Sequence, residues 1–141
     1  MKSIQLNNQE IQKFTKEGRT LAKSKAVNQP ITFFEKVLLN SSNDTTLILE
    51  YAKAMRDAQL YNEAETLYQK ALNKQPNKVS VLFSYARFLL LIKQYDKAFD
   101  LFERALSIEP NDYKLLNNYG NAKAKNKEFI KANELFERSL T

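Results

Sequence analysis

The stretches YNEAETLYQKALNKQPN, residues 61–77, and YDKAFDLFERALSIEPN, residues 95–111, decide the fold of this chain. They share the same order of tyrosine, alanine, aromatic residue, alanine–leucine pair and proline. The interval from Tyr61 to Tyr95 is one repeat period, and a third version begins one period later, at Phe129. Repetition at a period of this length is typical of a protein built by stacking copies of one supersecondary unit.

Each unit has the apolar spacing of two helices. Before the first turn, apolar residues recur every three or four positions, at Leu47, Ile48, Tyr51, Ala52 and Met55, which is the spacing of one helix face. The stretch that begins at Tyr61 has the same spacing, and Pro76 follows it where a helix cannot continue. Every unit therefore predicts a helix, a turn and a second helix.

The residues that recur at this period resemble the tetratricopeptide repeat, a 34-residue helical hairpin with fixed small and aromatic positions. The equivalent sets in three successive units are Ala52, Ala86 and Gly120; Ala64, Ala98 and Ala132; Tyr68, Phe102 and Phe136; Ala71, Ala105 and Ser139; and then Pro76 and Pro110. The tryptophan of the family pattern is replaced by Ile48, Leu82 and Leu116. The resemblance implies an all-α fold, a right-handed superhelical solenoid of tandem helix–turn–helix repeats.

The domain organisation follows from this register. We expect repeats at 45–78 and 79–112, an incomplete repeat at 113–141, a degenerate repeat at 11–44 and a short N-terminal extension at 1–10. Pro30 departs from the pattern in the degenerate repeat, but Gly18 and Gly120, the only glycines, lie three periods apart at the same small position. One hairpin cannot bury its own apolar face, so stacking of the copies is expected to form a continuous core.

Composition argues against several classes of function. The 141 residues include no cysteine and no histidine, and two isolated glycines cannot form a phosphate-binding loop. We therefore expect no enzyme, no cofactor and no metal site. The longest apolar run, residues 88–92, is too short to span a bilayer, and residues 1–10 lack the apolar segment of a signal peptide. These features predict a cytoplasmic protein with no membrane partner.

The net charge of +6 is distributed along the chain without a run of consecutive basic residues. The densest basic stretch holds Lys123, Lys125 and Lys127, whose spacing does not place them on one helix face, so we interpret them as solvated and expect no nucleic acid partner. A mildly basic surface favours acidic partners.

The family resemblance implies that the first helix of each repeat lines a concave groove that binds an extended or helical segment of another protein. The candidate groove residues are Leu49, Lys53, Arg56, Phe83, Arg87, Leu90, Lys114, Asn117, Asn118 and Asn121. The apolar side chains among them can bind an apolar anchor residue of the partner. The cations can bind its carboxylates, and the asparagine amides can form hydrogen bonds with its backbone. Packing of the leucines between repeats, with no binding role, is the alternative. The set of residues with which chaperone-binding relatives hold a C-terminal carboxylate is matched here only by Lys114.

A second function remains open on sequence grounds: a structural subunit, or part of a larger repeat protein, that self-associates. The last predicted helix carries Leu135, Phe136 and Leu140. The outer face of a repeat is normally covered by the next one, so in this second interpretation we expect a homodimer through this C-terminal helix.

Overall fold

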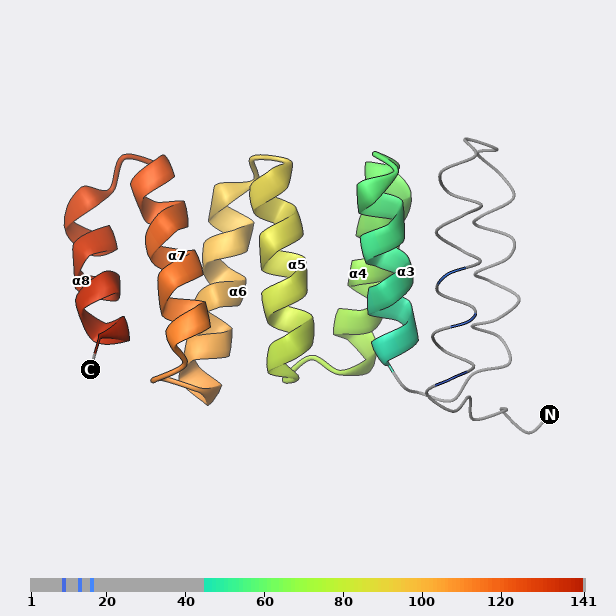
Figure 1. The fold of residues 1–141 in the computed structure, drawn as a ribbon, viewed down its shortest axis with the longest axis horizontal. Coiled ribbons are helices and arrows are strands. Elements are labelled where there is room, and N and C mark those ends of the chain that lie inside the picture. Colours follow the sequence, from blue (N-terminus) through green and yellow to red (C-terminus); the bar gives the residue numbers. More distant parts are fainter. Residues whose placement is uncertain (1–8, 10–12, 14–15, 17–44, 141) are drawn as a thin grey trace. The chain divides into compact units, whose positions relative to one another are not determined.

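The computed structural model describes residues 45–140, together with Gln9, Lys13 and Lys16. The N-terminal extension and the degenerate repeat predicted at 11–44 therefore lie almost entirely outside the described residues. In the described part the chain is all α-helix, without strands, as the sequence predicted (Figure 1). The helices are α3 (Thr45–Asp57), α4 (Tyr61–Lys74), α5 (Val79–Leu91), α6 (Tyr95–Ile108), α7 (Tyr113–Lys125) and α8 (Phe129–Ser139).

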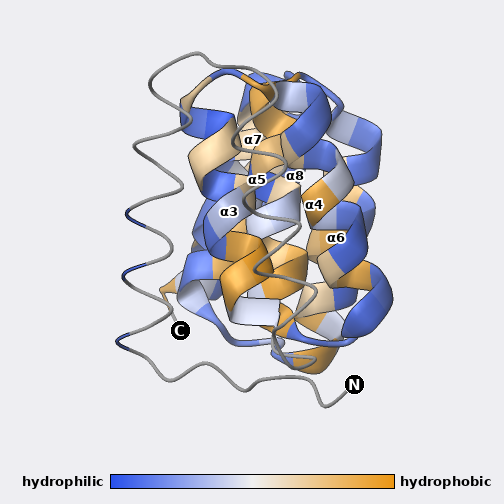
Figure 2. Ribbon diagram, turned by 90° about the vertical axis from the view of Figure 1, so that its right-hand side faces the viewer, coloured by the Kyte–Doolittle hydropathy of each residue, from blue (hydrophilic) through white to orange (hydrophobic). Residues whose placement is uncertain are grey.

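The helices follow the sequence period. The first helices α3, α5 and α7 start at equivalent positions of successive repeats, and so do the second helices α4, α6 and α8. Each first helix packs against the second helix that follows it, which gives three helical hairpins. Hydrophobic and hydrophilic residues alternate around the helix ribbons in Figure 2, as expected for helices that bury one face. None of the helices described is long and apolar enough to cross a membrane.

The same backbone turn joins the two helices of every hairpin. Gln59, Lys93 and Lys127 occupy equivalent positions in the three turns and have φ of 63°, 61° and 63°. In each turn the next residue donates its backbone N–H to a carbonyl five residues back, as from Gln94 to Leu89 at 2.8 Å. The left-handed residue itself donates to a carbonyl three residues back, as from Lys93 to Leu90 at 3.0 Å. This pair of bonds is the Schellman motif, which usually has glycine at the left-handed position.

The described chain divides into two compact units, with the boundary between residues 75 and 76, so that α3 and α4 belong to the first unit and α5 to α8 to the second. In the first, α3 and α4 bury a shared core of Ile48, Tyr51, Met55, Ala64 and Tyr68, each at most 1% exposed. The Thr45 hydroxyl donates a hydrogen bond to the side chain of Gln75 and so joins the start of α3 to the end of α4. The hairpin is thus closed at both ends, by its turn and by this bond.

The second unit contains two hairpins, and α7 contacts α6 and also α5 (Figure 1). The ring of Tyr119 stacks on Phe102, with centroids 5.2 Å apart, and lies 5.6 Å from Phe99. Its hydroxyl donates to the Glu103 carboxylate at 2.7 Å, and burial, together with this carboxylate, raises the pKa of Tyr119. These contacts pack α7 against α6, the second helix of the preceding repeat.

Close approach of α7 and α8 depends on Gly120. A Cβ atom at this position would lie 2.6 Å from Cε1 of Phe136, too close for an undisturbed contact. The small residue that the sequence pattern places here therefore makes room for an aromatic ring from the second helix.

Candidate protein-binding face

On α5, the predicted site residues Phe83, Arg87 and Leu90 are spaced four and three positions apart, so they share one helix face. Phe83 is half-buried, and its ring meets the Phe102 ring edge-on with centroids 6.4 Å apart. The exposed guanidinium of Arg87 lies 5.7 Å from the centroid of the Phe83 ring, within the range of a cation–π interaction. Leu90 is half-buried. The Phe83 ring thus supports the cation and contributes to the core of the hairpin.

On α7, the predicted residues Lys114, Asn117, Asn118 and Asn121 also fall on one face. The Asp112 carboxylate caps this helix by accepting the backbone N–H of Lys114 at 2.8 Å and of Leu115 at 3.1 Å. The Asn118 side chain donates to the Lys114 carbonyl at 2.7 Å, which occupies part of its hydrogen-bonding capacity. Lys114, Asn117 and Asn121 are exposed.

The two sets of residues hold equivalent places in neighbouring repeats. Asn117 follows Phe83 by one period, Asn121 follows Arg87 by the same interval, and α5 contacts α7. We call the set Phe83, Arg87, Leu90, Lys114, Asn117, Asn118 and Asn121 the α5–α7 face. Within the part of the chain that the structure describes, no carboxylate forms an ion pair with Arg87 or Lys114. The face therefore combines two cations, exposed amides and partly exposed apolar groups.

The remaining predicted residues lie on α3, in the other unit. Leu49 is only 6% exposed. Both cations already have carboxylates: Lys53 Nζ lies 3.2 Å from Glu50 Oε1, and Arg56 Nη2 lies 3.0 Å from Asp57 Oδ1. A ligand of this helix would have to replace these local ion pairs.

One charged cluster was missed by the sequence analysis. Lys123, interpreted there as solvated, is 7% exposed, and its ammonium lies 2.6 Å from Glu128 Oε2 and 3.9 Å above the Phe99 ring. The hydrogen bond from Lys123 lowers the pKa of the Glu128 carboxyl. The signal was present in the repeat itself, because Lys123 occupies the position that holds Met55 and Leu89 in the earlier units, and both of those are buried.

The described part of the chain contains no group of three or more His, Cys, Asp or Glu residues placed to hold a metal ion. The cations, amides and apolar groups of the α5–α7 face are suited to contact another chain.

Comparison with known proteins agrees with the repeat pattern. The sequence model of the tetratricopeptide repeat matches residues 67–100 and 101–132. The chain carries tetratricopeptide repeats. The two matches start one period apart, and each begins within a second helix, so they follow the period of the hairpins with a different starting point. No curated protein gives a significant match to the sequence.

Solved structures with a similar fold include several of the protein MamA. One crystal structure of MamA has a TM-score of 0.72 and 17% sequence identity, with 92% of this chain and 76% of that chain covered. A structure of MamA from Desulfovibrio magneticus RS-1, spanning residue 41 to the end, has a TM-score of 0.69 and 18% identity, with coverage of 92% and 73%. At these identities the likeness establishes a shared helical-repeat fold.

Proposed function

We propose that the chain is a protein-interaction module whose α5–α7 face binds an acidic, extended or helical segment of a partner protein. Its repeats belong to a class that serves generally in protein–protein interaction, which is the broader statement on which the proposal rests. The choice of the α5–α7 face rests on the cation–π contact between Arg87 and the Phe83 ring, on a helix that contacts the asparagine-rich helix α7. The cytoplasm remains the predicted location.

In this proposal, Arg87 and Lys114 bind carboxylates of the partner, because each is exposed and neither has a carboxylate in an ion pair among the described residues. The amides of Asn117 and Asn121 can each donate to and accept from the backbone of an extended segment. Phe83 and Leu90 are half-buried and offer a limited apolar surface to an anchor residue.

The α3 residues are a separate part of the proposal, because they lie in the first unit. Lys53 and Arg56 would exchange the carboxylates of Glu50 and Asp57 for those of the partner, at little cost where both groups stay near solvent. Leu49 is nearly buried and would contribute only after its neighbours rearrange.

A peptide library displayed on phage tests this function and does not require the partner to be identified first. Selection on the wild-type chain should enrich peptides that combine aspartate or glutamate with one large apolar residue. The binding of such a peptide should weaken by about tenfold or more when Arg87→Glu and Lys114→Glu are combined, since two attractive contacts become repulsive. Lys97→Glu is the matched control for Arg87→Glu alone, because each changes the net charge by about two units and Lys97 is exposed on the second helix α6.

Equal enrichment of the same peptides on the wild type and on the double variant would overturn the proposal. Enrichment of basic peptides would do the same, because the charge of the α5–α7 face predicts the opposite preference. Loss of binding in the Lys97→Glu control would also count against it, since that result would indicate attraction by overall charge.

A further inference from the structure

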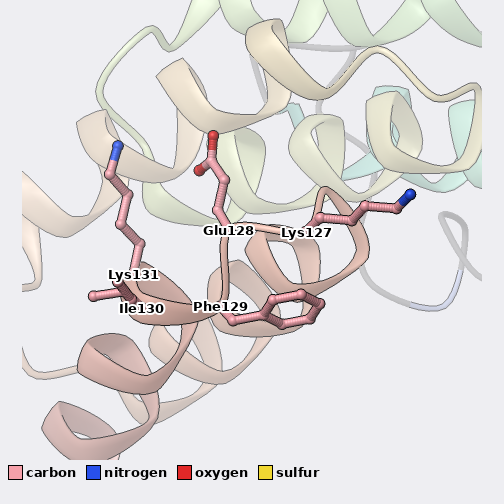
Figure 3. A pocket seen from close by; sticks show the side chains of 5 residues that line it. All are labelled: Lys127, Glu128, Phe129, Ile130 and Lys131. Atoms are coloured by element: carbon pink, nitrogen blue, oxygen red, sulfur yellow. The ribbon is translucent and has the colours of Figure 1, made fainter.

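The outer face of α8 carries more exposed apolar surface than any other helix described. Phe129 is 62% exposed, Ile130 78% and Leu140 87%. At 100° per residue these three fall on one side of the helix with Asn133, Phe136 and Glu137, within an arc of about 120°. We call these six residues the α8 stripe. Phe129 and Ile130 also line a shallow depression of about 380 Å³ with Lys127, Glu128 and Lys131 (Figure 3).

The α8 stripe is equivalent to the face of α6 that receives α7. Shifted back by one period, it becomes Tyr95, Asp96, Phe99, Phe102, Glu103 and Leu106. Three of these hold Tyr119 of α7, by ring contacts and by a hydrogen bond. The change in exposure is large, because Leu106 is 5% exposed and its equivalent Leu140 is 87% exposed. The α8 stripe therefore has the position of a repeat-to-repeat contact surface.

Two differences between α6 and α8 at equivalent positions make the α8 stripe unsuited to a helix like α7. Phe99, on whose ring both Tyr119 and the Lys123 ammonium rest, becomes Asn133. Asp96 becomes Ile130, which adds an apolar side chain at a position that is polar in both earlier repeats. An occupant of the stripe should therefore offer an apolar residue opposite Ile130 and a hydrogen-bonding group opposite Asn133.

A second copy of the same stripe meets both requirements. When two α8 helices lie antiparallel through their stripes and cross at the level of residue 135 along the helix axis, residues whose numbers add up to 270 face each other. Ile130 then packs on Leu140 of the second copy, and the Asn133 amide donates to the carboxylate of Glu137 of the second copy. A two-fold contact needs a self-complementary surface, and every such pair occurs twice. Parallel pairing would instead place the two Glu137 carboxylates together.

We propose that two copies of this chain dimerise through antiparallel contact of their α8 stripes. Such an interface is small, because α8 has 11 residues and a length of about 17 Å. It should therefore form a weak, concentration-dependent dimer. The inference does not depend on binding at the α5–α7 face, which lies on other helices.

Sedimentation equilibrium of the wild-type chain and two single variants tests this arrangement. Ile130→Glu and Leu140→Lys should each weaken self-association by about tenfold or more, because each homodimer then buries a charge against an apolar side chain twice. Both positions are exposed, so the melting temperature should hardly change. Ile108→Glu is the matched control, since Ile108 is 44% exposed at the end of α6 and outside the stripe.

Mixing the two single variants gives the decisive result. In the mixed dimer the two substituted positions face each other with opposite charges, while the other pair keeps its wild-type isoleucine and leucine. Dimerisation should therefore be stronger in the mixture than in either variant alone. A wild-type chain that stays monomeric at high micromolar concentration would overturn the proposal. A wild-type dimer that both variants leave intact, or that mixing fails to restore, would do so as well.

Discussion

Glycine in place of Lys93 and Lys127 should stabilise the protein. Both lysines are exposed and have left-handed backbone conformations, with φ of 61° and 63°. An L-residue in this conformation loses about 1–2 kcal/mol relative to its preferred one, because Cβ approaches the backbone carbonyl. Glycine removes that cost but adds about 0.5–1 kcal/mol of unfolded-state entropy. We therefore expect each substitution to add about 0.5–1 kcal/mol to the free energy of unfolding, and the pair to add about twice that.

Urea denaturation followed by circular dichroism measures this change. Lys93→Ala and Lys127→Ala are the matched controls, because alanine removes the same side chain but keeps the Cβ atom and should give no gain. The two turns are separated by a full repeat, so their effects should add. A loss of stability in the glycine variants, or an equal gain in the alanine variants, would refute the argument from backbone conformation.

Three other substitutions test the remaining contacts. Phe83→Ala should cost about 1–2 kcal/mol in thermal or urea unfolding, since its ring is half-buried against Phe102; no change would mean that the ring does not pack. Asp112→Ala should cost about 1 kcal/mol by the same measurement, because the carboxylate caps α7, and Asp112→Asn should retain most of that stability. Glu128 has a lowered pKa in the folded state, so its contribution is present above the ordinary carboxyl pKa of about 4.3 and is lost as the pH falls through the folded value. Glu128→Gln should remove this acid-sensitive part of stability, and an unchanged pH profile would contradict the ion pair with Lys123.

The sequence predicted the helical hairpins because their pattern recurs. The starts of α3, α5 and α7 follow the period, and Gly120, at the small position of the pattern, makes room for the Phe136 ring. The left-handed turns could not be predicted in the same way, because Gln59, Lys93 and Lys127 carry none of the usual glycine signal. In the structure this conformation accompanies the pair of backbone hydrogen bonds that ends the first helix of each hairpin.

The candidate binding residues were predicted less completely. Helix periodicity placed Phe83, Arg87 and Leu90 on one face, but it could not indicate that the Phe83 ring also packs against Phe102. The ring contact depends on the rotamer of Phe83 and on the neighbouring helix α6, which a spacing rule does not contain. The ion pairs of Lys53 with Glu50 and of Arg56 with Asp57 join residues close in sequence on α3, so their spacing could have indicated them, although the sequence analysis did not use it.

Nuclear magnetic resonance with a selected acidic peptide would test the central claim most directly. The peptide is added to the isotope-labelled chain, and amide shifts are followed for the backbone and for the asparagine side chains. We predict that the largest shifts occur at Arg87, Lys114, Asn117 and Asn121, including the side-chain amides of both asparagines. Shifts concentrated on α6 or α8, with these four residues unchanged, would contradict binding at the α5–α7 face.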